Sequence, residues 1–556
     1  MIFNFIKKNK ILSFLIFIGF IAHLLISFPS GSYYCFNGNC GLYFWGAHEH
    51  DAIWHLAIIE TAFKKYPPQH PTFAGENLTG YNYFLDLVIF LISKIGIPAI
   101  IFYFKILPVI WFLFYTYFTL KLAEKVSQSY WFKVFLLFFN YFGASFGVFF
   151  TLYHNKTIWG SSASLAMQPL LSLVNPQFAI SLIFILLILI NFFEKKLNKK
   201  IFLYCLYLFI NWGLKFYAGV ISSFLILGLI SIEKKKFRSK IFNFALIILS
   251  SILAIIIFYQ PFSATKTGSP LIFSPFSMVH AIIEEKNLFY LPNLVNARYF
   301  LYQFGFGPRL LAIELFSVFL FIFFNFGVRF FGLVYFLINF FKKKLDFFYL
   351  IIFLAILFSV SLTVFFIQKG MWWNTIQFTY YGLFLANIFT GLFFQALIKK
   401  KDLIFLFLIF IFILVNIPEN LDILKGFNPL KPGSYITQKE LEALNFLKKK
   451  EDGVILTITN FEDTLHKESA YVSALTGKQT YFNDLHVLNI TGIDYKKRQE
   501  EMSNLELINW EKIPIQYIYI LKSDNNFLKV LKKLKKLSNY KIVFENTEIT
   551  IIEKMK

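Results

Sequence analysis

The run ILSFLIFIGFIAHLLISF, residues 11–28, decides the fold class of this chain. It contains no Lys, Arg, Asp or Glu, and its length is close to the roughly 20 apolar residues with which a helix crosses a bilayer. Lys7, Lys8 and Lys10 stand ahead of it, so the segment also resembles a signal peptide. Because the apolar run is too long and has no small-residue cleavage site, we expect a retained membrane helix.

Runs of the same kind recur as far as residue 418. We expect further apolar helices near residues 83–97, 99–120, 131–150, 178–193, 201–214, 216–232, 241–258, 308–328, 347–368, 375–397 and 402–418. Of the 556 residues, 57% are hydrophobic and 21% aromatic, and the mean hydropathy is +0.59. A soluble protein of this composition would expose more apolar surface than water tolerates. The sequence therefore predicts a mainly α-helical, polytopic protein of the plasma (inner) membrane.

Lysine clusters separate the apolar runs, at Lys195–Lys196, Lys199–Lys200, Lys234–Lys236, Lys342–Lys344 and Lys399–Lys401. Cytoplasmic turns carry such an excess of Lys and Arg, so the net charge of +22 reflects topology and indicates no nucleic-acid partner. With the N-terminus inside and the last helix ending outside, the number of spans must be odd. Either residues 83–97 dip in without crossing, which gives 11 spans, or residues 161–174 also cross, which gives 13.

An acidic, histidine-rich stretch follows the first apolar run: Gly46-Ala47-His48-Glu49-His50-Asp51-Ala52-Ile53-Trp54-His55. If residues 49–59 continue as a helix, Asp51 and His55 lie four residues apart on one face. Ionisable groups at the edge of a membrane are costly to keep, so this cluster is the first candidate for a functional site. The alternative is a solvated polar loop.

Other polar residues stand in or next to the segments that the charge rule places outside. The first outer loop, residues 29–82, also carries His70, and Asp86 lies just inside the next apolar run. Asp86 is either a second acidic site residue or a buried polar partner. Four basic residues near the outer boundary could bind a phosphate or serve a structural role at the interface: Lys215, Arg298, Arg309 and Lys369.

Cys35 and Cys40 bracket four residues of the same loop. On the outer side of the membrane a disulfide between them would persist. The alternative is two unpaired thiols.

The composition changes from about residue 429. Pro429, Pro432 and Gly433 mark a linker, and residues 429–556 are soluble in character. Thr437 and Glu440 suggest a capping box at the start of a helix over 437–450. With strands expected at 453–459, 516–521, 541–545 and 548–552, and helices at 494–504 and 526–538, we expect a small α/β domain on the outer side. Residues 1–428 would then form the transmembrane bundle.

Sugar transfer from a lipid phosphate has simple chemical requirements. A carboxylate near the anomeric carbon accepts the proton of the acceptor hydroxyl or orients that hydroxyl. A cation offsets the charge that develops on the leaving phosphate. The histidine-rich cluster offers the carboxylate, the four basic residues offer the cation, and outer loops that return to one face of a bundle can enclose such a site.

An acidic residue in a long first outer loop, directly after the first helix, resembles the GT-C superfamily of glycosyltransferases, such as the protein O-mannosyltransferases and the lipid A aminoarabinose transferases. Glu49 and Asp51 match the catalytic acid of that loop. The stretch from His70-Pro71 to Tyr81-Asn82-Tyr83 loosely matches its proline-containing end. The segment Tyr471–Tyr481 is similar to tails of uncharacterised bacterial members of the group. The three histidines of the cluster are not explained by the family.

The resemblance implies an integral membrane glycosyltransferase that moves a sugar from a polyprenyl-phosphate donor to a lipid, glycan or protein hydroxyl, among membrane lipids. We expect Asp51 to be the catalytic base and Glu49 and His55 to support it, although Glu49 remains the alternative base. The predicted substrate-binding residues are His50, His70, Asp86, Lys215, Arg298, Arg309 and Lys369. No cofactor is expected; the alternative is a divalent metal on His50 and Asp51. The rival functions are a lipid-linked glycan transporter or flippase and a membrane-anchored envelope scaffold.

Overall fold

The computed structural model of the chain describes residues 9–159, 166–194, 197–234, 236–261, 271–459, 464–467, 470–504, 506–524, 527–534, 537 and 539–555. Lys195–Lys196, Lys235 and the first part of the 161–174 run lie outside these residues. The chain forms two compact units. We call residues 1–26, 109–255 and 269–426 the helical unit, and residues 27–108, 256–268 and 427–556 the loop unit.

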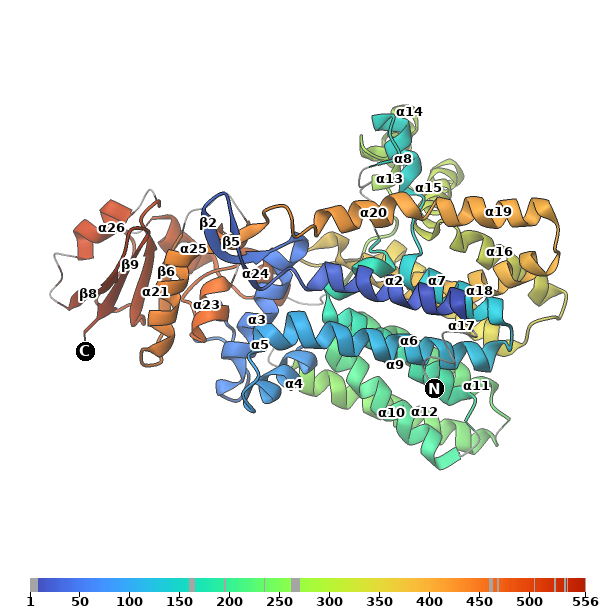
Figure 1. Cartoon of the computed structure of the whole chain (residues 1–556), viewed down its shortest axis with the longest axis horizontal. Coiled ribbons are helices and arrows are strands. Elements are labelled where there is room, and N and C mark those ends of the chain that lie inside the picture. Colours follow the sequence, from blue (N-terminus) through green and yellow to red (C-terminus); the bar gives the residue numbers. More distant parts are fainter. Residues whose placement is uncertain are drawn as a thin grey trace. The chain divides into compact units, whose positions relative to one another are not determined.

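Long apolar helices build the helical unit, with α18 packed against α7, α16 and α17 (Figure 1). Many of the packed faces carry phenylalanine, as where Phe135 and Phe139 of α7 meet Phe394 of α18. The described helices that belong to this unit or enter it are α2 Lys10–Ser27, α6 Leu107–Val126, α7 Tyr130–Phe142, α8 Gly147–Asn155, η4 Pro169–Val174, α9 Pro176–Phe192, α10 Leu197–Leu214, α11 Phe216–Ile232, α12 Phe237–Tyr259, α13 Ala281–Glu284, α14 Pro292–Tyr302, α15 Pro308–Phe326, α16 Arg329–Phe341, α17 Phe347–Phe365, η5 Trp372–Thr375, α18 Ile376–Lys399, α19 Leu403–Leu414 and α20 Ile417–Gly426. A short ribbon, β3 Leu271–Phe273 with β4 Phe366–Gln368, lies beside α17.

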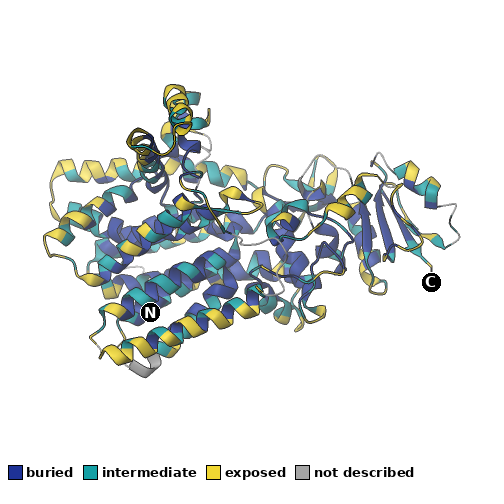
Figure 2. Ribbon diagram, turned by 180° about the vertical axis from the view of Figure 1, so that it is seen from behind, coloured by how far each residue is buried: buried dark blue, intermediate teal, exposed yellow. Residues whose placement is uncertain are grey.

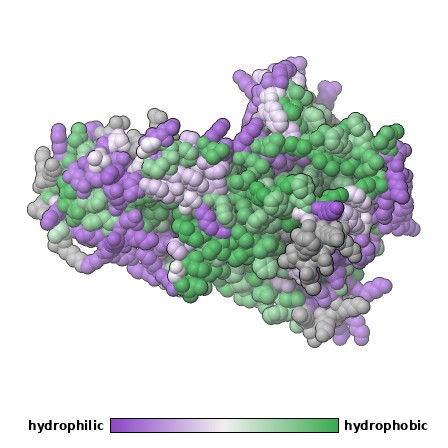
Figure 3. All heavy atoms as spheres, viewed as in Figure 1, coloured by the Kyte–Doolittle hydropathy of each residue, from purple (hydrophilic) through white to green (hydrophobic). Residues whose placement is uncertain are grey.

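Seven described helices are long and apolar enough to cross a membrane. They are Lys10–Ser27, Ala99–Val126, Phe237–Tyr259, Pro308–Phe326, Phe347–Phe365, Trp372–Lys399 and Leu403–Gly426. The bent pair α7 and α8 adds an eighth if it counts as one span, and five more apolar helices are shorter. Hydrophobic residues cover much of the surface over these helices (Figure 3). The chain is therefore a polytopic helical membrane protein, whereas the count of 11 or 13 spans and the sidedness stay predictions.

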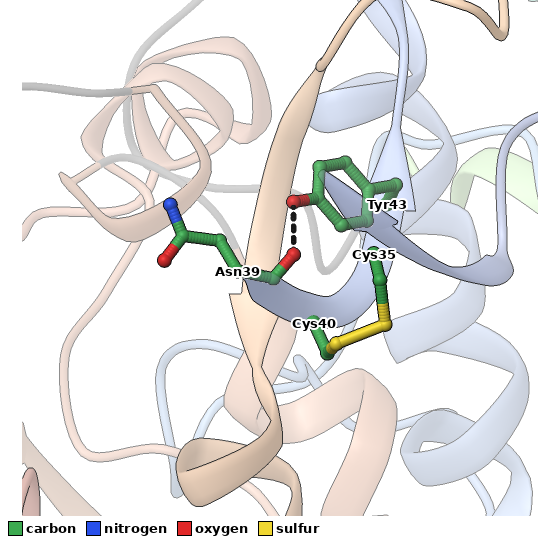
Figure 4. Close-up of a disulfide and its surroundings, with 4 residues drawn as sticks. All are labelled: Cys35, Asn39, Cys40 and Tyr43. Atoms are coloured by element: carbon green, nitrogen blue, oxygen red, sulfur yellow. Dashed lines mark hydrogen bonds between the residues drawn. A yellow bond between two sulfur atoms is a disulfide. The ribbon is translucent and has the colours of Figure 1, made fainter. Parts of the chain in front are cut away.

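The loop unit begins with a hairpin. Strands β1 Ser32–Phe36 and β2 Asn39–Phe44 pair antiparallel, with Cys35 directly opposite Cys40. These two cysteines form a disulfide (Figure 4). Asn37 and Gly38 form the turn, both with positive φ, as a tight hairpin turn requires. The remaining helices before residue 108 are η1 Gly46–Glu49, α3 Asp51–Thr61, η2 Ala62–Lys64, α4 Phe84–Ser93, α5 Ala99–Ile101 and η3 Phe102–Ile106.

The C-terminal residues form the expected α/β fold. Strands β6 Ile455–Ile458 and β7 Tyr517–Leu521 are parallel, while β9 Ile549–Lys554 pairs antiparallel with both β7 and β8 Tyr540–Glu545. Strands β6 and β7 and most of β9 are buried (Figure 2), because helices cover both faces, whereas β8 at the edge of the sheet is partly exposed. Val530 and Leu534 of α26 (Phe527–Leu534) pack on one face. On the other, Tyr519 donates a hydrogen bond to Glu440 of α21 (Gln438–Lys449), and Thr437 with Glu440 forms the predicted capping box.

The first outer loop and the C-terminal residues belong to the same compact unit. Strand β5 (Ser434–Thr437) pairs antiparallel with β2, and α3 packs against α23 (Tyr471–Thr476). The small helices α22 Thr464–Lys467, α24 Leu485–Thr491 and α25 Lys496–Ser503 complete the described elements of this unit. The expected division into a bundle of residues 1–428 and an extracytoplasmic domain of residues 429–556 stays a prediction.

Candidate functional site

The tail segment 471–481 forms backbone hydrogen bonds with the first outer loop. Thr480 N donates to Pro71 O at 2.9 Å, and Ala74 N donates to Thr480 O at 3.0 Å. Asn483 N donates to Thr72 O at 3.0 Å. The tail that was singled out by resemblance is thus the partner of the loop, and it brings the next residues toward the start of α3.

The centre of the candidate site is an imidazole between two carboxylates. His50, which precedes α3, has Nδ1 3.1 Å from Asp51 Oδ1 and Nε2 3.2 Å from Asp484 Oδ1. The side chain of Asp484 is fully buried, that of His50 is 13% exposed, and that of Asp51 is 47% exposed. A second imidazole ring, that of His486, lies edge-to-face with that of His50, with the ring centroids 5.1 Å apart. In this cluster Asp484 and His50 are therefore the buried members, and the carboxylate of Asp51 is the one that solvent reaches.

The charge state of His50 follows from this geometry. Burial alone lowers its pKa, but hydrogen bonds to Asp484 and Asp51, together with the charges of both carboxylates, raise the pKa to about 10. An imidazolium at neutral pH donates from both ring nitrogens. His50 thereby holds Asp51 in place and fixes it to the buried Asp484.

Asp484 is positioned by its own backbone. It has a left-handed conformation with φ of 60°, which Asp and Asn adopt more readily than most residues. Its Oδ1 also accepts a hydrogen bond from Val487 N at 3.2 Å, so Asp484 caps the start of α24. Neither Asp484 nor His486 is predicted from the sequence as a site residue. The available signal was their place directly after the 471–481 segment.

A second, buried pair lies one turn along α3. His55 Nδ1 is 3.0 Å from Asp86 Oδ2 of α4, and neither side chain is more than 2% exposed. The ring of Tyr81 lies 5.9 Å from that of His55. Burial raises the pKa of Tyr81 well above its usual range, and the charges of Asp86, Asp51 and Asp484 add to this effect. Tyr81 is therefore a neutral phenol among carboxylates.

Glu49 and His70 have other surroundings. Glu49 ends η1 and accepts a short hydrogen bond from Ser434 of β5. His70 is fully buried beside the ring of Trp54, and burial lowers its pKa to about 3. His70 is thus a neutral packing residue, and Glu49 supports the strand that joins the loop to the tail. The role predicted for each residue stays a prediction.

The four predicted basic residues all belong to the helical unit. Lys215 joins α10 to α11 and is buried, whereas Arg309 and Lys369 are exposed. Arg298 lies between two carboxylates, with Nε 3.0 Å from Glu314 and Nη1 3.1 Å from Glu284. Its charge is therefore already balanced inside the protein.

The acids and histidines do not assemble a metal centre in the described part of the chain, where no three His, Cys, Asp or Glu residues are arranged to hold an ion. In the loop unit, His50 uses both ring nitrogens toward carboxylates. A divalent metal on His50 and Asp51 would have to displace these contacts.

The comparisons with known proteins find similarity among solved structures. No protein-family model matches the sequence, and the curated proteins include no match. Among solved structures, the chain is similar to the crystal structure of the Archaeoglobus fulgidus oligosaccharyltransferase in the apo form. The two are 13% identical, the match covers 92% of this chain and 70% of that one, and the TM-score is 0.42. This similarity is too low to transfer residues or chemistry, so the proposal below rests on the side chains of this protein.

Proposed function

We propose that this protein is an integral membrane glycosyltransferase of the GT-C type. It takes a sugar from a polyprenyl-phosphate donor and transfers it to a hydroxyl of a lipid, glycan or protein. The observation that carries the proposal is the half-exposed carboxylate of Asp51, held by the imidazolium of His50 on the buried Asp484. A solvated polar loop has no need of a buried counter-charge behind an exposed acid.

The proposed step is a single displacement at the anomeric carbon. The acceptor oxygen forms the new bond, and the bond between the sugar and the donor phosphate breaks with its electron pair leaving on the phosphate. The acceptor proton passes to Asp51 as its oxygen attacks. Since Oδ1 of Asp51 is held by His50, the carboxylate enters the reaction already oriented, which removes an entropic cost.

The imidazolium also fixes the place of the proposed base. His50 Nδ1 lies 3.1 Å from Oδ1 of Asp51, so the carboxylate is held while it orients the acceptor hydroxyl and accepts its proton. The cation for the leaving phosphate stays a prediction, with Lys215, Arg298, Arg309 and Lys369 as the candidates; of these, Arg298 already pairs with Glu284 and Glu314.

The test is sugar transfer by the full-length protein in nanodiscs, with a set of labelled polyprenyl-phosphate sugars and membrane extract as the acceptor source. We expect Asp51→Asn to lower the rate by about 100-fold or more, the usual contribution of a positioned base. Glu49→Gln tests the alternative base, and the exposed Asp494→Asn is the matched control. Full activity of Asp51→Asn with loss in Glu49→Gln would move the base to Glu49. Transfer from no donor by the wild type would refute the transferase and favour a transporter or a scaffold.

A further inference from the structure

A large cavity lies within the helical unit and takes no part in the proposed chemistry. Its volume is about 1200 Å³, above the roughly 300–1,000 Å³ of a pocket for a small ligand. One end is lined by His280, Glu284, Arg298 and Glu314, and most of the remaining wall is apolar. The volume and the lining fit a ligand with a large apolar part and a small polar part.

Much of the apolar wall comes from two helices that are long enough to cross the membrane, α15 and α17. Leu315 and Leu357 line it and are 55% and 43% exposed. Exposed apolar side chains on membrane helices contact hydrocarbon. An acyl chain therefore contacts apolar groups both in the cavity and in the bilayer. Selectivity for one lipid over another must then come from the polar residues of the cavity.

The polar end is a buried network of four charged or titratable groups. Glu314 is 4% exposed and lies within α15; its Oε2 is 2.5 Å from His280 Nε2, and its Oε1 is 3.0 Å from Arg298 Nε. The same guanidinium reaches Glu284 at 3.1 Å. Such residues inside a membrane helix are costly and mark functional sites by default.

The network is never positive while its two carboxylates are ionised. Two carboxylates face one guanidinium and one imidazole, so the net charge is −1 with a neutral His280 and zero with a charged one. An added anion would meet no excess of positive charge, whereas an ammonium group can share a carboxylate that Arg298 already contacts. Glu284 is the more accessible acid, since 29% of its side chain is exposed.

We propose that this cavity binds a membrane lipid whose headgroup carries an ammonium group, with the ammonium at Glu284 and an acyl chain along α15 and α17. The partner is identified by charge complementarity at the polar end and by the apolar wall. The proposal does not depend on the transferase activity.

The experiment uses the full-length protein, purified in a nonionic detergent, delipidated and given equal amounts of phosphatidylethanolamine and phosphatidylglycerol with the same acyl chains. The two headgroups share the phosphate and differ in the ammonium. Native mass spectrometry measures the ratio of the two lipids bound. We expect about a fivefold preference for phosphatidylethanolamine, the order of magnitude that one partly solvated charge-assisted hydrogen bond provides.

Glu284→Gln keeps the size of the side chain and removes its charge. It should bring the bound ratio close to one. Glu285→Gln, the next residue, is exposed and absent from the lining, so it should keep the wild-type ratio. A preference for phosphatidylglycerol, equal binding by the wild type, or an unchanged ratio in Glu284→Gln would overturn the proposal.

A second measurement needs no variant. A photoreactive phosphatidylethanolamine should crosslink the wild-type protein within residues 273–284, α14, α15 or α17, which line the cavity. Crosslinks confined to other segments would also overturn the proposal.

Discussion

Replacing Asp484 by Asn isolates the charge that holds His50. Asn keeps the shape of the side chain, suits the left-handed backbone at this position, and can still cap α24. Only the negative charge behind His50 is lost. Because an opposite charge within about 4–6 Å shifts a pKa by roughly 1–3 units, the pKa of His50 should fall by that amount from its value of about 10.

The pKa shift determines how stability depends on pH. The pKa of His50 is raised from 6.5 to about 10 by folding, so its contribution is complete below pH 6.5 and is lost as the pH rises through about 10. At about 1.4 kcal/mol per unit, the full shift corresponds to an upper limit on the order of 5 kcal/mol. Loss of Asp484 should remove roughly 1.4–4 kcal/mol of this at pH 7.

The assay is the thermal unfolding of the full-length protein and of Asp484→Asn from pH 6 to pH 10.5. The difference between them should be largest near pH 6–7 and should shrink as the pH approaches 10. The buried Oδ2 of Asp484 has no hydrogen-bond partner among the described residues, so an amide there adds a cost that does not depend on pH. A difference that stays constant over the whole range would refute the ion-pair argument. Asp494→Asn, an exposed acid of the same unit, is the control.

Three further predictions concern single contacts. Asp86→Asn should destabilise the protein by about 3–5 kcal/mol, since it removes one partner of the buried pair with His55; thermal unfolding at pH 6 measures this. Thr437→Ala should cost about 1 kcal/mol by loss of the capping box, whereas Thr437→Ser should keep most of the stability. Gly143→Ala should destabilise the helical unit by about 1–3 kcal/mol through overpacking, because an added Cβ would lie 2.1 Å from Arg329 Nη2; thermal unfolding and yield of folded protein in detergent measure this.

The sequence predicts what depends on local patterns. Most of the apolar runs became helices close to the expected bounds, the four C-terminal strands lie where alternation and turns indicated, and Thr437 with Glu440 caps α21. The predicted run at 131–150 is two helices, α7 and α8, separated by residues 143–146. The predicted run at 308–328 is helical as far as Phe326, where the positive φ of Gly327 ends α15 before α16 begins.

The partners within the candidate site depend on tertiary contacts. His50 meets an acid 434 residues away, and no local period encodes that pairing. Asp86 was more predictable, because a carboxylate in an apolar run needs a buried partner and His55 is among the few groups nearby in the chain. Arg298 illustrates the opposite case: as an isolated cation it suggested a phosphate ligand, but acids 14 and 16 residues away balance its charge.

The position of the proposed base thus depends on the contacts between the tail and the first outer loop. A substitution of Arg498 tests this dependence. Its guanidinium donates to Tyr481 O at 2.6 Å and to Ala74 O at 2.8 Å, and it stacks between the rings of Phe73 and Tyr481. Arg498→Leu leaves both carbonyls without this donor and should cost about 2–4 kcal/mol.

If the tail positions Asp484, Arg498→Leu should also lower the pKa of His50. The stabilisation by His50 would then be lost at a lower pH than in the wild type, although the contacts of Arg498 given above include neither Asp484 nor His50. Arg498→Lys, which restores one charged donor, should recover part of both effects. A loss of stability with an unchanged pH dependence would mean that the hydrogen bond between Asp484 and His50 does not depend on the contacts of Arg498. The stability of the loop unit and the geometry of the proposed base would then be independent of each other.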